Sequence, residues 1–315
     1  MRPHTLILES QNYSPEALKL LQKLGPVEIY EAGSDDEEVY PETNLLVARL
    51  GYHINAEFLK RFPAVKMIAS PTTGLNHIDL EYCMNHEIRV VSLKGETGFL
   101  QQITATAELT LGLLLSVVRQ IPAGIRSVVS DHQWDRDAHR GRDLNGMTLG
   151  ILGYGRLGRI VAGYGRALGM KVLASDIREP AAENEDRVSY CSQAELFKNC
   201  DIVSLHAGYS EANRHMVDGV DFDRMRTGSY FINTARGELV NEDALLDALE
   251  SGKLAGAGLD VLDNEQDQAG LFKKPLIKYA QGHSNLLITP HIGGCTLESM
   301  HKTELFLARK IESIM

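Results

Sequence analysis

The chain has 315 residues, of which 43% are hydrophobic and 23% are charged. At roughly 150 residues per domain, this length predicts about two domains, and the composition is that of a globular protein rather than a disordered or fibrous one. Lysine and arginine number 32 and aspartate and glutamate 42, so the formal net charge is −10. Because no basic cluster stands out that would neutralise phosphates, we set aside binding to duplex nucleic acid.

The cysteines are scattered, with no CxxC spacing, at Cys83, Cys191, Cys200 and Cys295. This spacing predicts neither a disulfide framework nor a metal site, and it is typical of a reducing compartment. The first residues lack the long apolar segment of a secretory signal. The most apolar stretch, residues 109–118, is shorter than the roughly 20 residues that a membrane span needs. We therefore expect a cytoplasmic protein with no membrane partner and no bound metal.

Short apolar runs alternate with helical patterns along the chain, which predicts βαβ units and parallel sheets. In the first part, a helix is expected to begin after Ser14, with Pro15 in its first turn, and to end at Gly25. Strands are expected there at 5–9, 45–49, 65–70 and 88–92.

The second part of the chain continues the same alternation. Ser192 and Glu195 predict a capping box before a short helix, and Asn241 predicts the start of a helix that stops at Gly252. Strands are expected at 147–152, 171–175, 201–205, 229–233, 255–259 and 286–289. Further expectations are a long helix over 100–119, an irregular segment over 131–144, an amphipathic helix over 297–315 and a solvated acidic loop over 34–38.

The strongest local motif is a GxGxxG that follows a predicted strand directly and opens a helical pattern. In such a turn Gly153 allows the tight bend, Gly155 lets the backbone approach a pyrophosphate, and Gly158 lets the helix pack on the strand. Arg156 and Leu157 then lie at the helix N-terminus, where unpaired N–H groups attract phosphate. A purely structural turn is the alternative, but the complete unit favours a dinucleotide site.

The second strand of this unit ends in Asp176, 18 residues after Gly158. A carboxylate there can accept hydrogen bonds from a ribose diol, and its charge repels a 2′-phosphate. The position therefore favours NAD over NADP, although the nearby Arg178 keeps NADP open as the less favoured cofactor.

Polar residues also follow other predicted strands. In an open parallel sheet, ligands bind outside the carboxyl ends of the strands. The residues just past these ends are Asp176, His206, Arg236, Asp260 and His291. Each one alone could be a turn former, a satisfied histidine or a surface ion-pair partner, but the joint pattern favours one shared site.

Three residues of the second part suggest chemistry. The guanidinium of Arg236 can bind a carboxylate through two hydrogen bonds. His291 can exchange a proton near neutrality. Glu265 can orient that histidine and favour its protonated form, although a position unrelated to the site is equally supported for Glu265 by spacing alone.

These motifs resemble those of the D-isomer-specific 2-hydroxyacid dehydrogenases. The matching segments are GYGRLG with Asp176, SLH at 204–206, NTARGEL at 233–239, GLDV at 258–261 with Glu265, and TPHIGG at 289–294. SPTTGLNHID at 70–79 and TAELTLGLLL at 106–115 are also similar to family segments, so the resemblance covers nearly the whole chain.

The resemblance implies an α/β fold in which a Rossmann domain, a doubly wound parallel sheet over residues 101–293, is inserted into a smaller flavodoxin-like α/β domain made of 1–100 and 294–315. It implies an oxidoreductase that transfers a hydride between NAD(H) and C2 of a small D-2-hydroxy or 2-keto acid, such as glyoxylate or hydroxypyruvate. It also implies a homodimer joined through residues 100–143, although a core helix is the alternative for 109–118.

Site residues follow from the same resemblance. Arg236 would hold the substrate's carboxylate and carbonyl oxygen, His291 would exchange the proton, and Glu265 would keep His291 positioned. Backbone amides of Thr73, Gly74 and Leu75 would cradle the carboxylate. The implied cofactor contacts are Gly153, Gly155, Arg156, Leu157, Gly158, Asp176, His206, Thr234, Ala235, Asp260, Gly293 and Gly294.

The chain departs from the family pattern at Gly208 and Gln266, where proline is common, and over 93–102. Two other functions stay open: an NAD-sensing binding protein similar to the family's corepressors, and a dehydrogenase of another small anion such as phosphite. Glu265 argues against formate, for which the family has glutamine. Arg49 and His53 follow a predicted strand and either meet a distal substrate group or lie in a solvated loop.

Overall fold

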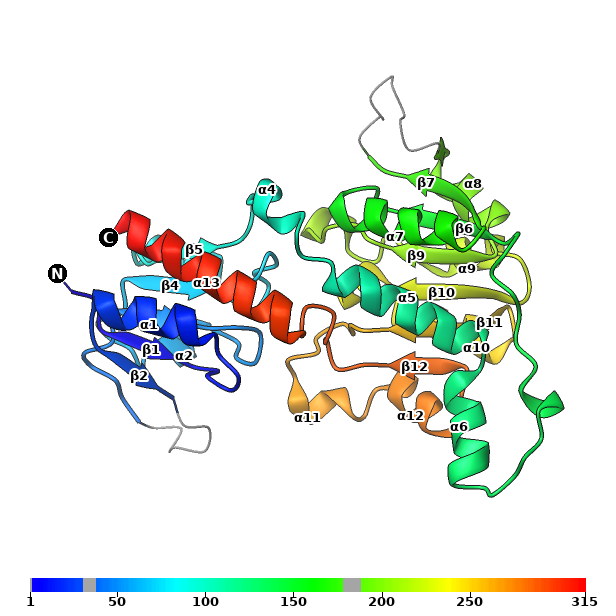
Figure 1. Cartoon of the computed structure of the whole chain (residues 1–315), viewed down its shortest axis with the longest axis horizontal. Helices are drawn as coiled ribbons and strands as arrows, with labels where there is room; N and C mark the ends of the chain where they lie inside the picture. The colour runs from blue at the N-terminus through cyan, green and yellow to red at the C-terminus, as the bar shows by residue number, and fades with distance from the viewer. Residues whose placement is uncertain (1, 31–37, 178–187) are drawn as a thin grey trace. The chain divides into compact units, whose positions relative to one another are not determined.

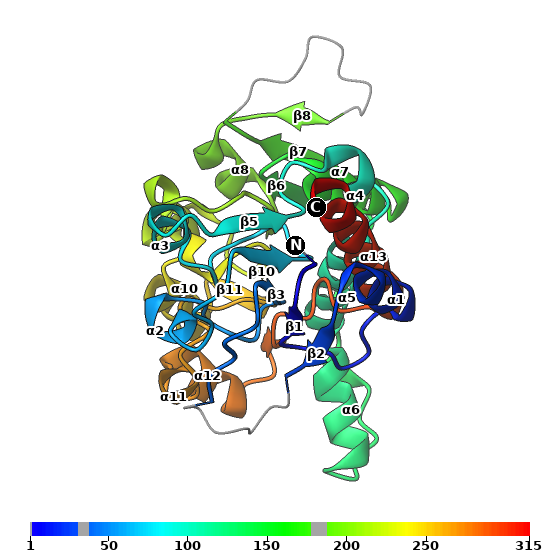
Figure 2. The same ribbon diagram turned by 90° about the vertical axis from the view of Figure 1, so that its left-hand side faces the viewer.

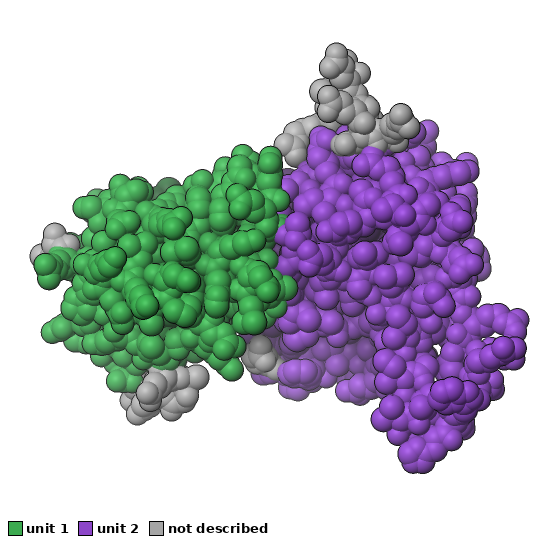
Figure 3. All heavy atoms as spheres, in the orientation of Figure 1, with its two compact units in different colours: residues 1–103, 295–315 green, residues 104–294 purple. Residues whose placement is uncertain are grey.

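The computed structural model describes residues 2–30, 38–177 and 188–315 (Figure 1). The chain divides into two compact units (Figure 3), unit 1 with residues 1–103 and 295–315 and unit 2 with residues 104–294. The junctions therefore lie at 103/104 and 294/295, against the 100/101 and 293/294 expected from the sequence. Arg178 and most of the acidic run at 34–38 lie outside the described residues.

Unit 1 contains a five-stranded parallel sheet in the order β2-β1-β3-β4-β5. The strands are β1 (Thr5–Ile7), β2 (Val27–Ile29), β3 (Leu45–Val47), β4 (Met67–Ser70) and β5 (Arg89–Ser92). Strand β2 was not expected from the sequence. It has only three residues, lies at the sheet edge and is partly exposed, so its sequence carries no buried-strand pattern.

Helices cover both faces of this sheet, with α1 (Pro15–Leu24) and α13 (Leu297–Ile314) on one side and α2 (Ala56–Leu59) and α3 (Leu80–Asn85) on the other (Figure 2). The expected start and end of α1 are confirmed: Ser14 Oγ accepts from the Ala17 N–H, and Gly25 follows the last turn. Helix α13 buries Leu307 and Ile311 against the sheet, which attaches the C-terminal segment to the first part of the chain.

Unit 2 contains a seven-stranded parallel sheet in the order β12-β11-β10-β9-β6-β7-β8. Its strands are β6 (Thr148–Leu152), β7 (Lys171–Ser175), β8 (Ser189–Tyr190), β9 (Ile202–Leu205), β10 (Ser229–Asn233), β11 (Leu254–Leu259) and β12 (Leu286–Ile288). The chain starts in the interior at β6, builds outward to β8, and returns to β9 on the other side, which is the doubly wound pattern. The expected fold class is thus confirmed.

The helices of unit 2 also form two layers (Figure 1). On one face lie α5 (Ala105–Val118) and α7 (Arg156–Ala167), and on the other α8 (Gln193–Asn199), α9 (Gly219–Arg224), α10 (Glu242–Glu250) and α12 (Pro275–Gly282). The remaining helical elements of unit 2 are α6 (Ile121–Val129), α11 (Gln268–Leu271), and the single turns Asp137–His139, Glu211–Asn213 and Gly237–Leu239, whereas α4 (Thr97–Leu100) belongs to unit 1. The capping box at Ser192 and Glu195 is confirmed.

The expected single helix over 100–119 is wrong, because the chain breaks between α4, which ends at Leu100, and α5, which begins at Ala105. Among the described residues, Thr97–Val118 is the one stretch with the length and hydropathy that a membrane crossing requires. Helix α5 instead packs Leu113, Leu114 and Val117 into the core of unit 2. The core-helix alternative for 109–118 is thereby supported.

Candidate active site

The glycine-rich turn after β6 has the geometry expected of a phosphate loop. Gly153 has φ +95°, and a Cβ there would lie 2.4 Å from the Ala207 amide nitrogen, so only glycine fits. A Cβ on Gly158 would lie 2.3 Å from the Gly153 carbonyl oxygen, which explains how closely α7 approaches the turn. Gly155 is the N-cap of α7 and makes no side-chain cap hydrogen bond, and Arg156 and Leu157 form the first turn, the end of a helix that attracts phosphate.

Asp176 follows β7 and braces this turn, since its Oδ2 accepts a hydrogen bond of 2.7 Å from the Tyr154 N–H. The sequence did not indicate this contact. It places the carboxylate beside the phosphate loop, where the ribose of a dinucleotide would lie.

The five polar residues that follow strands lie at one edge of the sheet, because all strand pairs of unit 2 are parallel and their carboxyl ends meet there. They follow β7 (Asp176), β9 (His206), β10 (Arg236), β11 (Asp260) and β12 (His291). The expected convergence at one sheet edge is therefore observed.

His206 is half-buried, and protein covers its Nδ1. Its Nε2 lies 2.8 Å from Ser204 Oγ, and its Nδ1 has no hydrogen-bond partner among the described residues. Burial lowers the pKa of His206 to about 4. The side chain is thus a neutral group near pH 7 and does not compete with His291 as a proton donor.

Glu265 and His291 touch through a hydrogen bond between Oε1 and Nδ1. The second carboxylate oxygen of Glu265 accepts from the Leu262 N–H at 3.2 Å, which fixes the orientation of the carboxylate. Because Nδ1 of His291 is engaged, Nε2 is the ring nitrogen left for an incoming substrate, and it makes no hydrogen bond to any described residue.

Arg236 completes the trio with Glu265 and His291. Burial lowers the pKa of its guanidinium, and the negative charges of Glu265 and Glu238 oppose that shift. The guanidinium nevertheless stays charged, since arginine is not deprotonated in proteins near neutral pH. Its backbone is held by Asn233, whose side chain donates to the Arg236 carbonyl at 2.9 Å and accepts from the Ala235 N–H at 2.9 Å.

Asp260 organises the loop that carries His291. Its Oδ1 accepts from the Ile292 N–H at 2.8 Å and from Thr289 Oγ at 2.6 Å, and its Oδ2 accepts from the Gly293 N–H at 2.7 Å. His291 itself has φ +54°, a left-handed conformation that costs about 1–2 kcal/mol in a non-glycine residue. The hydrogen bonds to Asp260 offset that cost and fix the imidazole, a role that the sequence analysis missed.

The remaining cofactor candidates lie on the same edge. Thr234 Oγ1 is 2.7 Å from Thr110 Oγ1 of α5, Ala235 follows it, and Gly293 is buried against Asp260 whereas Gly294 is exposed. A Cβ on Gly293 would lie 2.9 Å from Asp260 Oδ2, so the loop tolerates only glycine without moving. Their contacts with a cofactor stay predictions.

In unit 1, the expected carboxylate cradle lies in the loop after β4. Thr72 Oγ1 donates to the Gly74 carbonyl at 2.8 Å and lies 2.8 Å from Ser70 Oγ, so the loop is held by its own hydroxyl groups. No described residue accepts a hydrogen bond from the amides of Thr73, Gly74 or Leu75. These amides are therefore available to an anion.

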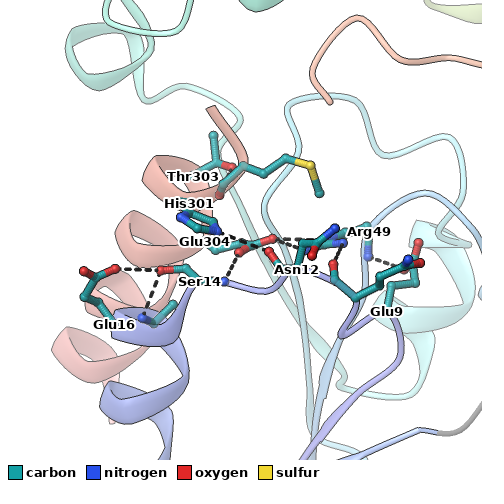
Figure 4. A network of polar contacts seen from close by, with 11 residues as sticks. Glu9, Asn12, Ser14, Glu16, Arg49, His301, Thr303 and Glu304 are labelled. Carbon is teal, nitrogen blue, oxygen red and sulfur yellow. Dashed lines mark hydrogen bonds and ion pairs between the residues drawn. The ribbon is translucent and has the colours of Figure 1, made fainter. Parts of the chain in front are cut away.

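Arg49 is neither solvated nor free. Figure 4 shows its guanidinium directed at Glu304 of α13, where Nε donates to Oε1 at 3.0 Å and Nη2 bonds the same oxygen. The other oxygen of Glu304 accepts from the Ser14 N–H at 2.7 Å. The charge of Arg49 is thus balanced within unit 1, while His53 is exposed.

The described residues contain no cluster of three or more His, Cys, Asp or Glu side chains that could hold a metal ion.

Comparison with known proteins gives a consistent result. The NAD-binding domain of the D-isomer specific 2-hydroxyacid dehydrogenases matches residues 111–293. A hydroxypyruvate reductase of Thermotoga maritima is 32% identical over 299 residues, 94% of each chain, and a putative 2-hydroxyacid dehydrogenase of Staphylococcus aureus is 33% identical over 291 residues, 90% of this chain and 87% of that one. A D-lactate dehydrogenase of Aquifex aeolicus, solved with NAD and lactic acid, aligns with a TM-score of 0.80 and 29% identity over 99% of this chain and 95% of that one.

Proposed function

Because this chain belongs to the D-isomer specific 2-hydroxyacid dehydrogenases, a family of NAD-dependent enzymes, we propose that it transfers a hydride between NAD(H) and C2 of a short 2-keto or D-2-hydroxy acid. The observation that carries the proposal is the trio: an imidazole held by a carboxylate, beside a half-buried guanidinium, at the edge of the sheet that carries the phosphate loop. Glyoxylate and hydroxypyruvate are the substrates we favour.

The residues of unit 2 fit a dinucleotide. The turn at Gly153 has no room for a side chain, Gly155 is the N-cap of α7, and Asp176 lies beside that turn. These groups would bind the pyrophosphate and the ribose, and the negative charge of Asp176 favours NAD over NADP. When bound, NADH supplies the hydride for C2 of the keto acid.

Arg236 and His291 have different roles toward the substrate. Arg236 would bind the carboxylate and carbonyl oxygen of the keto acid and polarise the carbonyl group. His291 would donate the proton from Nε2 to that oxygen as it becomes an alkoxide, and in the reverse direction it would accept the proton of the hydroxyl group. Glu265 acts through His291, because its bond to Nδ1 fixes the tautomer and stabilises the imidazolium.

The substrate class is supported by two features of unit 1. The amides of Thr73, Gly74 and Leu75 provide donors for one carboxylate. Arg49, the cation that follows β3, is neutralised by Glu304 and offers no free charge to a second anionic group. We therefore propose monocarboxylic keto acids whose side chains carry no charge.

The test is a panel of 2-keto acids with NADH and with NADPH, together with oxidation of D- and L-glycerate by NAD⁺ and of phosphite by NAD⁺. We expect turnover of glyoxylate or hydroxypyruvate with NADH and oxidation of only the D-isomer of glycerate. Clear binding of NADH without turnover on the panel would refute the proposal and favour an NAD-sensing binding protein. Oxidation of phosphite alone would favour the other dehydrogenase.

We also propose a homodimer joined through residues 100–143. Helix α6 supports this, because Ile121, Ile125, Val128 and Val129 are exposed large apolar residues of one short helix, and Trp134 beyond it is 89% exposed. A second copy of the chain would cover this surface. A cytoplasmic location is part of the proposal and is supported by the four cysteines, all of which are free thiols.

A further inference from the structure

The peptide between Leu262 and Asp263 lies next to groups that bear on two members of the trio, Glu265 and Arg236. The N–H of Leu262, which belongs to the preceding peptide, donates to Glu265 Oε2 at 3.2 Å. The plane of the peptide between Leu262 and Asp263 lies against Gly237, the residue after Arg236, so closely that a Cβ on Gly237 would lie 1.9 Å from the Leu262 carbonyl carbon. A displacement of this peptide would therefore move Glu265 relative to Arg236.

A carboxylate outside the trio holds the peptide in place. Glu242, the first residue of α10, accepts the Asp263 N–H on Oε1 at 2.7 Å and binds Lys274 Nζ through Oε2 at 2.7 Å. The side chains are only 16% and 21% exposed, so the pair is shielded from solvent. Lys274 in turn precedes α12, and the peptide is thus attached to two helices that pack in the core of unit 2.

From these contacts we propose that Glu242, supported by Lys274, is a positioning residue for Glu265 and, through it, for the proton transfer at His291. The inference rests on the proposed dehydrogenase function. Its physical basis is that proton transfer is steep in distance, so a shift of about 1 Å in a supporting group lowers the rate by up to ~100-fold. Glu242 bonds Asp263 and Lys274 and neither the glycine-rich turn at 153–158 nor Asp176, so we expect the binding of the nucleotide to stay unchanged.

Two substitutions separate the hydrogen bond from the charge. Glu242→Gln keeps an oxygen that can accept the Asp263 N–H, and we expect its kcat to stay within about 3-fold of the parent chain. Glu242→Ala removes the acceptor, and we expect kcat to fall by about 10–100-fold, with an unchanged dissociation constant for NADH. Lys274→Met keeps the carboxylate of Glu242 but removes the ammonium group that binds it. We expect its kcat to lie between the values of Glu242→Gln and Glu242→Ala.

Asp201 provides a matched control in the same unit. Its Oδ2 accepts the Thr148 N–H at 2.8 Å and its Oδ1 binds Arg226 at 3.0 Å, the same arrangement as at Glu242, but at the amino-terminal edge of the sheet. Asp201→Ala should lower the melting temperature by an amount similar to Glu242→Ala. Its kcat should stay within about 2-fold, since nothing near the trio depends on it.

The solvent isotope effect on kcat is the readout that a merely structural role would not move. We expect it to rise in Glu242→Ala and Lys274→Met, because proton donation becomes more rate-limiting, and to stay unchanged in Asp201→Ala. Three results would overturn the proposal. The first is an equal loss of kcat in Glu242→Ala and Asp201→Ala, and the second is a kcat of Glu242→Gln as low as that of Glu242→Ala. The third is an unchanged isotope effect in Lys274→Met. The Lys274→Met result decides the matter if Glu242→Ala does not fold. A parent chain without turnover would instead refute the proposed function.

Discussion

The pair between Arg49 and Glu304 (Figure 4) predicts a large effect on the stability of unit 1. The Glu304 side chain is 1% exposed and the Arg49 side chain 16%. Replacing Glu304 with leucine leaves the guanidinium without its counterion and the buried Ser14 N–H without an acceptor. Removing one partner of a buried pair costs about 3–5 kcal/mol, and the partial exposure of Arg49 favours the lower value.

The assay is urea unfolding, monitored through the hydrogen exchange of peptides from β3 and α13. With a denaturant slope of about 2 kcal/mol per molar, a loss of about 3–4 kcal/mol lowers the midpoint of unit 1 by roughly 1.5–2 M. The double variant Arg49→Met, Glu304→Leu replaces both charges with apolar groups. It should be more stable than the Glu304→Leu single variant and lie about 1–2 kcal/mol below the parent chain, because only the Ser14 N–H stays unsatisfied.

A control lies on the same helix. Lys310 and Glu96 form an ion pair whose side chains are 30% and 32% exposed, and Lys310→Met should cost no more than about 1 kcal/mol. The reasoning would be refuted if Glu304→Leu cost no more than this control, or if the effects at Arg49 and Glu304 simply added in the double variant.

Three further predictions concern the cofactor, the pH dependence and the assembly. Asp176→Asn keeps an acceptor for the Tyr154 N–H but removes the charge, so the preference for NADH over NADPH in kcat/KM should fall by about 10-fold; an unchanged ratio would remove Asp176 from this role. Burial lowers the pKa of His206 from 6.5 to about 4, so the unfolded chain binds the proton more readily than the folded chain. The free energy of unfolding should therefore fall by about 1–2 kcal/mol between pH 7 and pH 5. Urea unfolding of His206→Gln at both pH values should lack this part of the pH dependence. Val129→Asp should dissociate the dimer in sedimentation velocity whereas Val220→Asp, on another exposed surface, should not; equal masses for both variants would contradict the proposed interface.

Much of the candidate site could be predicted because a parallel sheet brings the carboxyl ends of its strands to one edge. Arg236 and His291 are 55 residues apart in the sequence, yet each follows a strand, so the topology alone places them at the same edge. Helix starts at Ser14, Ser192 and Asn241 could also be predicted, because a cap depends on residues only two or three positions away.

The supporting contacts could not be predicted, because they join residues far apart in the sequence. Asp260 reaches amides 32 and 33 positions later, and Glu304 accepts from the Ser14 amide 290 positions earlier. The sequence around an acidic residue does not indicate which distant amide its carboxylate will bind. The break between Leu100 and Ala105 was missed for a related reason: the apolar pattern continues across it, and only the division into two units separates the helices.

The most direct test of the account is His291→Asn, measured by turnover of glyoxylate or hydroxypyruvate with NADH and by the dissociation constant of NADH in the same preparation. Asparagine tolerates the left-handed backbone at this position but cannot donate a proton as an imidazolium does. We expect kcat to fall by about 10²–10⁴-fold while the dissociation constant for NADH changes less than about 3-fold. Retained turnover, or an equal loss of NADH binding, would contradict the assignment of proton transfer to this histidine.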